Sequence, residues 1–129
     1  MRPLICRFCN DSLFGNSNLC SFCRNELMKI RLHNARAVKK LLPATLTIEE
    51  CLVTLEYFHR KCAYCRGEYE IIEHFIPIAL GQKGTTFDNC VPSCKKCNKA
   101  KWDKSPELVL HERVFRRVQK YLVNCISTS

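Results

Sequence analysis

Eight of the eleven cysteines in this sequence stand in four Cys-x-x-Cys pairs, a spacing that brings two thiolates to one metal ion. Two such pairs complete a tetrahedral zinc site that leaves no position for water, so we expect two structural zinc ions. The first site consists of the N-terminal cysteine cluster, Cys6, Cys9, Cys20 and Cys23. The second consists of the central cysteine cluster, Cys62, Cys65, Cys94 and Cys97.

The central cysteine cluster encloses polar side chains that can bind a hard metal ion or transfer a proton. Glu73 and His74 are adjacent, Asn89 follows them in the same loop, and Asn98 comes directly after the last cysteine. If zinc joins the two ends of this segment, these side chains are held in a fixed frame that needs little hydrophobic core. We expect the chemistry of the protein to take place there.

The overall composition bounds the partners and the compartment. The 129 residues suffice for one modest domain, or for two small units stabilised by metal. We find neither the apolar run of a secretory signal nor a segment of membrane-spanning length, so a reducing, cytoplasmic location is expected, with no membrane partner. Lys and Arg outnumber Asp and Glu by 21 to 12, which gives a net charge of +9 and favours a nucleic-acid partner.

The cysteine clusters divide the chain into two expected units, residues 1–45 and residues 46–129. In the first unit, a basic helix over residues 25–42 follows the cysteine cluster and ends before Pro43. Its basic face suits a solvated surface and a phosphate-binding surface equally. His33 has no partner at metal-ligand spacing, so we assign it to packing or to the surface. Whether the N-terminal unit contacts DNA or protein stays open.

The second unit combines helices with a short β structure. A capping box between Thr47 and Glu50 predicts a helix to about residue 60. The apolar, β-branched run over residues 69–78 predicts a strand, and Ser105–Pro106 predicts the start of a last helix over residues 107–123. A short helix is expected from about residue 93. Phe87 and Trp102 are assigned to packing.

The segments CAYC, EHFIP, FDNCVPSC and CNKAK, in this order, resemble the motif of HNH endonucleases, in the variant whose third letter is Asn. The resemblance covers about residues 46–107, and four linked segments framed by two Cys-x-x-Cys pairs make it specific. It implies a small α+β fold of the ββα-metal type, in which a two-stranded ribbon and a helix surround one catalytic divalent ion. The N-terminal unit lies outside the resemblance.

The resemblance also implies roles for individual residues. His74 would be the general base, Asn89 would organise the loop that presents it, and Glu73 and Asn98 would bind one Mg²⁺ or Mn²⁺ ion. Asp is commoner than Glu before the histidine. Moreover, neighbours in a regular strand point to opposite faces, so Glu73 and His74 can share a site only where the strand is distorted or ends. Lys101, one helical turn after Asn98, is expected to be the active-site cation that contacts phosphate.

These roles suit hydrolysis of a phosphodiester bond. An imidazole with an ordinary pKa of about 6.5 can take a proton from water at neutral pH. A hard ion held by one carboxylate and one amide oxygen keeps positions for water and phosphate. The expected function is metal-dependent cleavage of double-stranded DNA. Because one active site cuts one strand, a double-strand break would need a homodimer or two encounters.

Two alternatives differ from this function in class. One is a zinc-dependent DNA-binding protein without catalysis, which would retain DNA on a gel without cleaving it. The other is a protein-interaction module of the RING type, which would have little salt-dependent affinity for DNA. The interaction module leaves His74, Asn89 and Asn98 unexplained.

Overall fold

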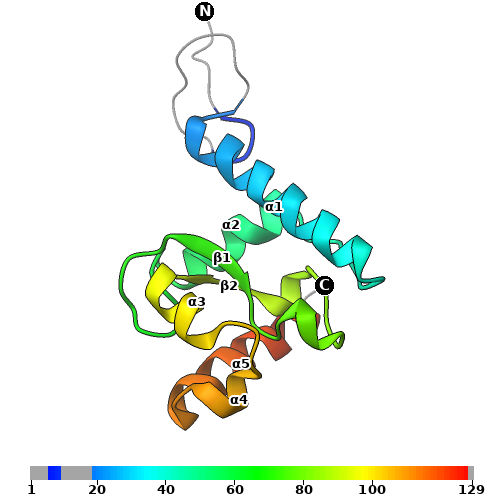
Figure 1. Cartoon of the computed structure of the whole chain (residues 1–129). Coiled ribbons are helices and arrows are strands. Elements are labelled where there is room, and N and C mark those ends of the chain that lie inside the picture. The colour runs from blue at the N-terminus through cyan, green and yellow to red at the C-terminus, as the bar shows by residue number, and fades with distance from the viewer. Residues whose placement is uncertain (1–5, 10–18, 128–129) are drawn as a thin grey trace, which may run out of the picture.

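The computed structural model describes residues 6–9 and 19–127, and it is a small α+β fold built around a two-stranded hairpin (Figure 1). The segment between the two pairs of the N-terminal cysteine cluster, residues 10–18, lies outside the described residues. The elements are α1 (Ser21–Lys39), α2 (Ile48–Tyr57), β1 (Ile71–His74), η1 (Ile78–Leu80), η2 (Phe87–Asn89), β2 (Cys90–Ser93), α3 (Lys95–Lys101), α4 (Pro106–Val109) and α5 (Glu112–Ser127). The expected ββα arrangement is confirmed by β1, β2 and α3.

Both cysteine clusters also start a helix. Cys20 is the N-cap of α1, where its Sγ accepts a hydrogen bond of 3.3 Å from the backbone N–H of Cys23. Cys94 caps α3 in the same way, through a 3.3 Å bond from the N–H of Cys97. A partly negative sulfur is favoured at a helix N-terminus, where backbone N–H groups lack partners. The predicted start of the first helix at residue 25 is therefore wrong, because Cys20 already acts as the cap.

The hairpin separates two hydrophobic clusters. Strands β1 and β2 pair antiparallel, with Ile72 opposite Pro92, Glu73 opposite Val91 and His74 opposite Cys90. Because neighbouring side chains alternate between faces, Ile72 and Cys90 pack with α1 and α2, whereas Val91 packs with α5. Figure 1 shows α1 and α2 on one side of the hairpin and α4 and α5 on the other. His74 is thus directed to the side of α1.

Helix α1 is joined closely to the rest of the structure. Ile30 is buried in the same cluster as Leu46 and Ile72. The hydroxyl of Tyr69 donates a 2.5 Å hydrogen bond to Glu26, whose side chain is buried on α1. Position 84 requires glycine, because a Cβ there would lie 1.9 Å from the carbonyl oxygen of Pro43, which lies between α1 and α2. These contacts fix where α1 lies relative to the hairpin.

The helix that follows Thr47 agrees with its prediction from the sequence, and the last helix does not. The capping box of α2 is confirmed, because Thr47 and Glu50 exchange the expected hydrogen bonds. The prediction of one last helix over residues 107–123 is wrong, because the structure has two helices there. Helix α4 ends at Val109, Leu110 is extended, and α5 starts at Glu112. The ring Nδ1 of His111 accepts a 3.1 Å bond from the N–H of Arg113 and so caps the new helix. Within the described residues, no helix is long and apolar enough to cross a bilayer.

Candidate active site

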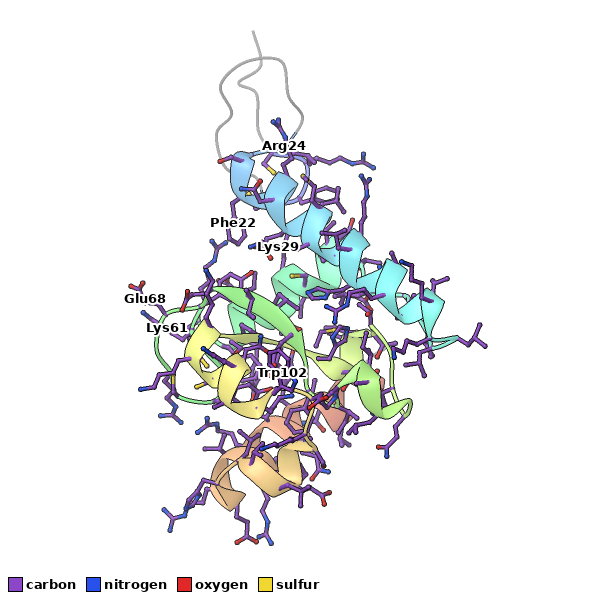
Figure 2. All side chains as sticks on the ribbon, in the orientation of Figure 1. Phe22, Arg24, Lys29, Lys61, Glu68 and Trp102 are labelled. Carbon is purple, nitrogen blue, oxygen red and sulfur yellow. The ribbon has the colours of Figure 1, made fainter. Side chains whose placement is uncertain are left out.

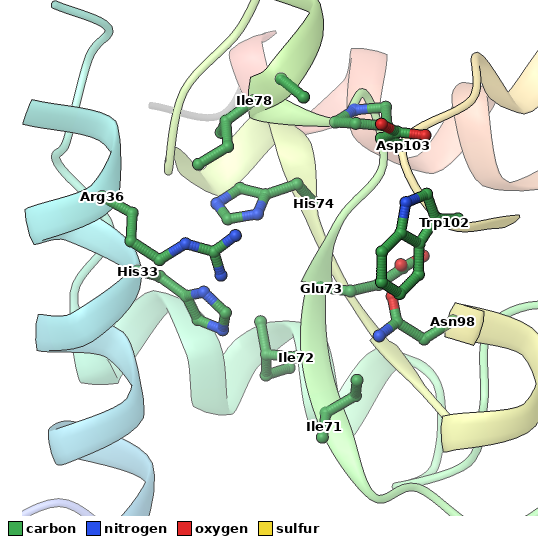
Figure 3. Close-up of a pocket in the computed structure, with 12 residues that line it drawn as sticks. His33, Arg36, Ile71, Ile72, Glu73, His74, Ile78, Asn98, Trp102 and Asp103 are labelled. Carbon is green, nitrogen blue, oxygen red and sulfur yellow. The ribbon is translucent and has the colours of Figure 1, made fainter. Parts of the chain in front are cut away.

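A pocket of about 360 Å³ lies beside β1, between α1 and the end of α3 (Figure 3). Three predicted site residues, Glu73, His74 and Asn98, line this one pocket. The polar side chains around it are His33, Arg36, Glu73, His74, Asn98 and Asp103. Asn89 and Lys101 are buried and do not line this pocket.

The strand brings Glu73 and His74 to one pocket without distortion. Both residues keep regular antiparallel register with β2, so their side chains leave the strand on opposite faces. In the described part of the chain, β1 pairs only with β2, which leaves its other edge open to the pocket. The strand also ends at His74. Figure 3 shows His74 on the side of α1 and Glu73 on the side of Asn98, with the strand between them.

Hydrogen bonds determine which nitrogen of His74 carries the proton. Its Nε2 lies 2.7 Å from the hydroxyl oxygen of Thr85. That hydroxyl donates its single hydrogen to the carbonyl oxygen of His33, at 2.9 Å. Thr85 can therefore only accept from His74, so Nε2 is protonated and Nδ1 is the nitrogen with a free lone pair. The side chain of Thr85 is fully buried and had no signal in the sequence.

The surroundings of His74 also keep its ring neutral. Burial lowers the pKa of His74 to about 3, and the nearby charges of His33, Arg36 and Lys101 act in the same direction. This value lies far below the ordinary pKa of about 6.5 of an exposed imidazole. In the folded protein the imidazole is therefore neutral at neutral pH, which is the form that a general base requires, and the same low pKa makes it a weaker proton acceptor than an exposed imidazole.

Asn89 ties the loop after β1 to the start of β2. Its side-chain oxygen accepts a 2.8 Å bond from the N–H of Ile76, and its amide group donates to the carbonyl oxygens of Ile76 and Gly84 at 3.0 and 2.9 Å. The residue is fully buried. With these bonds made, the Asn89 side chain holds the loop and does not face the pocket.

Glu73 is buried between a tyrosine and a lysine. The hydroxyl of Tyr64 donates to one carboxylate oxygen, and the Nζ of Lys101 lies 3.7 Å from the other. Burial raises the pKa of Glu73 to about 7, although Lys101 and the Tyr64 hydroxyl both act to lower it. Lys101 also donates a 3.1 Å bond to the carbonyl oxygen of His74.

This position of Lys101 differs from the expected one. The spacing from Asn98 correctly placed the lysine beside the site, but its side chain is only 1 % exposed. A direct contact with a substrate phosphate would require the ammonium group to leave Glu73. A buried lysine is stabilised by an anionic partner, which explains why the side chain turns inward.

The donors around Glu73 fit a hard divalent ion. The amide of Asn98 is directed towards Glu73 in Figure 3, and no hydrogen bond within the described residues occupies it. One carboxylate and one amide oxygen are the donor types that Mg²⁺ and Mn²⁺ prefer. The ammonium group of Lys101 beside the same carboxylate repels a cation, so these two ligands would hold the ion weakly before substrate binds.

Both cysteine clusters have the geometry of a thiolate metal site. Within each cluster all four Sγ atoms lie within 4.8 Å of one another. The Sγ atoms of Cys65 and Cys94 are 3.7 Å apart, and those of Cys9 and Cys20 are 3.6 Å apart. Ligands at about 2.3 Å around tetrahedral zinc are about 3.8 Å from each other. The clusters therefore fit a tetrahedral ion such as zinc.

Several pocket residues were not expected from the sequence. Trp102 lines the pocket and is 69 % exposed (Figure 2), so its assignment to packing is wrong. It follows the last residue of α3 with a φ of 48°, which turns the chain away from the helix. Phe87 packs against the core as expected. His33 and Arg36 come from α1, and no motif spacing relates them to His74.

Comparison with known proteins assigns the central segment to a family. Residues 62–104 match the family described as HNH endonuclease. The match includes the central cysteine cluster, β1, β2 and α3, and it leaves out α1, α2 and α5. No curated protein matches the chain.

Proposed function

Because residues 62–104 of this chain form an HNH endonuclease domain, we propose that the protein is a metal-dependent endonuclease that hydrolyses phosphodiester bonds in double-stranded DNA. One observation carries the proposal: Glu73, His74 and Asn98 line one open pocket from the two sides of β1. The net charge of +9 and the exposed lysines of α3 suit a polyanionic substrate.

In the proposed reaction, His74 is the general base. Its Nδ1 takes a proton from the water that attacks phosphorus, while the bond from phosphorus to the leaving oxygen breaks. Thr85 holds the ring in the required tautomer, and Asn89 holds the loop that carries the following residues. The divalent ion that Glu73 and Asn98 would hold supplies stabilisation of charge on the phosphate and on the leaving oxygen.

The remaining charged group at the site has a positioning role. Lys101 compensates the buried carboxylate of Glu73 and holds the carbonyl oxygen of His74, so it fixes both residues relative to α3. Without this lysine the carboxylate would be buried with no positive partner, which disfavours its charged form.

Zinc is the ion we propose for both cysteine clusters. In the central cluster it would join the segment before β1 to the start of α3. Strand β1 carries Glu73 and helix α3 carries Asn98, so the ion would hold these two residues in place relative to each other. In the N-terminal cluster it would hold the first turn of α1. Four thiolates leave no open position on zinc, so both ions are structural. One active site would cut one strand, so a double-strand break would need a second copy of the chain or a second encounter with the DNA.

The proposed function is tested by incubating the zinc-loaded protein with supercoiled plasmid and Mg²⁺ or Mn²⁺. We expect conversion to nicked and then linear DNA, and no conversion when EDTA is added immediately before the DNA. Retention of DNA on a gel without conversion under either ion would support the DNA-binding alternative. Neither conversion nor salt-dependent retention would support the protein-interaction alternative.

Thr85 provides a test of the base assignment that leaves His74 in place. The Thr85→Val variant has no hydroxyl, so the ring of His74 loses the acceptor that fixes its tautomer. A general base contributes about 10²–10⁴-fold, and we expect the variant to lose about 10- to 100-fold in single-turnover rate with an unchanged Kd for DNA. Thr85→Ser should retain most of the rate. Equal rates for the valine and serine variants would contradict this role.

A further inference from the structure

A second cavity continues the candidate active site along α1. This cavity of about 480 Å³ lies between α1 and β1. His33, Arg36, Ile71 and Ile72 line both the cavity and the active-site pocket. The two hollows therefore adjoin at these four residues, and we call the pair of them the α1 groove. It begins beside His74 and runs along the helix.

The basic side chains of the α1 groove lie on one face of the helix. Lys29, Arg36 and Lys39 line it. They stand at i, i+7 and i+10, which is the spacing of one helix face. At 1.5 Å per residue they cover about 15 Å along the axis, comparable to the rise of about four base pairs of duplex. The row has the length and the charge to follow a nucleic-acid backbone.

Arg36 stands at the point where the groove meets the reacting groups. Figure 3 shows its guanidinium group directed into the pocket, beside the rings of His33 and His74. Within the described residues, no carboxylate forms an ion pair with Arg36 and no hydrogen bond occupies its guanidinium group. By contrast, Lys29 lies 3.4 Å from Glu26. The charge on Arg36 is available for a ligand.

The two walls of the pocket have complementary chemistry. Arg36 on the α1 wall presents N–H donors and a positive charge. Glu73 and Asn98 on the opposite wall present oxygen atoms that suit a cation. A phosphodiester group has anionic oxygens for both walls, because one can accept from the guanidinium group while another faces the cation side.

We propose that α1 forms part of the substrate site of the nuclease: Arg36 binds the phosphate that is cleaved, and Lys29 and Lys39, which flank Arg36 along the helix, bind the DNA backbone on either side of it. This inference rests on the proposed function and adds to it. The helix lies outside the segment that matches the HNH family, so the N-terminal unit contributes directly to the active site.

The test compares two double variants that remove equal charge from α1 and its C-cap residue. Arg36→Ala/Lys39→Ala changes the α1 groove. Arg31→Ala/Lys40→Ala is the matched control, since both of these residues are exposed and line neither hollow. Binding is measured as the Kd for a short duplex at several salt concentrations. Zinc content and the circular dichroism spectrum verify that both variants fold.

We expect the groove variant to bind DNA at least 10-fold more weakly than the control variant. Each lost phosphate contact lowers the slope of log K against log salt by about 0.9, so two contacts should lower it by about 1.8. Equal affinities and equal slopes for the two variants would overturn the proposed DNA path. The binding measurement does not need cleavage, so it tests the groove even if wild-type protein fails to cut plasmid.

A single substitution separates the role of Arg36 from general charge attraction. At saturating DNA, Arg36→Ala should lower the single-turnover rate at least 10-fold, whereas Arg31→Ala should leave it within 2-fold of wild type. Arg36→Lys should recover part of the rate, because it restores the charge without the two-pronged donor. Wild-type protein that cuts DNA, together with an Arg36→Ala variant that cuts at the same rate, would overturn the phosphate contact and leave the proposed nuclease function standing.

Discussion

Replacing His74 by alanine is expected to lower the rate of DNA cleavage by at least about 100-fold, because the proposed mechanism then has no group that takes the proton from water. The pocket would keep Glu73 and Asn98, and both cysteine clusters would keep their ligands. Zinc content and affinity for DNA should therefore stay close to wild type. The rate is measured in single turnover with a labelled duplex, at saturating protein and a fixed Mg²⁺ concentration.

The matched control for this variant is His111→Ala. His111 is exposed and lies between α4 and α5, outside the candidate active site. It should cleave at the wild-type rate, although the loss of its bond to Arg113 will slightly weaken the start of α5. A His74→Ala protein that binds zinc and DNA and still cleaves as fast as His111→Ala would rule out His74 as the base.

The second large effect concerns the central cysteine cluster. The Cys94→Ser variant should lose one of the two bound zinc ions and unfold around the hairpin, because structural zinc contributes on the order of 10 kcal/mol to small domains. Serine is itself a good N-cap, so it preserves the start of α3 and removes only the thiolate. Zinc is counted with a chromogenic chelator, and unfolding is followed by circular dichroism.

Cys51→Ala is the control for the loss of a cysteine as such. Cys51 is buried on α2 and belongs to neither cysteine cluster, so its replacement should cost only the packing of one sulfur atom. This variant should keep two zinc ions and a cooperative unfolding transition. A Cys94→Ser protein with two zinc ions and wild-type stability would show that the central cluster does not hold a structural ion.

Much of the hairpin and the assembly of the two four-cysteine clusters could be predicted because the determinants are local in sequence. Each cysteine pair, the capping box at Thr47 and the order of the motif segments depend on spacings of a few residues. The ββα order followed from the resemblance. The proximity of Glu73, His74 and Asn98 was implied by the same resemblance, and the open edge of β1 explains it physically.

Other features depend on how distant segments pack, and the sequence has no local signal for them. The spacing of Lys101 from Asn98 gave its position but not the direction of its side chain, which depends on the buried carboxylate of Glu73. Thr85 and Arg36 lie near His74 only because α1 and the loop before β2 meet there. The low pKa of His74 is likewise a result of burial, which no spacing reveals.

The hydrogen bond from Thr85 to the carbonyl oxygen of His33 has a practical consequence for protein engineering. A fragment cut to the family match, residues 62–104, would leave behind the helix that accepts this bond and would uncover Ile72 and Cys90. Such a fragment would contain every motif residue and Thr85, but not the carbonyl oxygen of His33, which accepts the Thr85 hydroxyl hydrogen and so leaves Thr85 as an acceptor for His74. Transfer of the HNH domain into a fusion protein would therefore have to include α1 as well as residues 62–104.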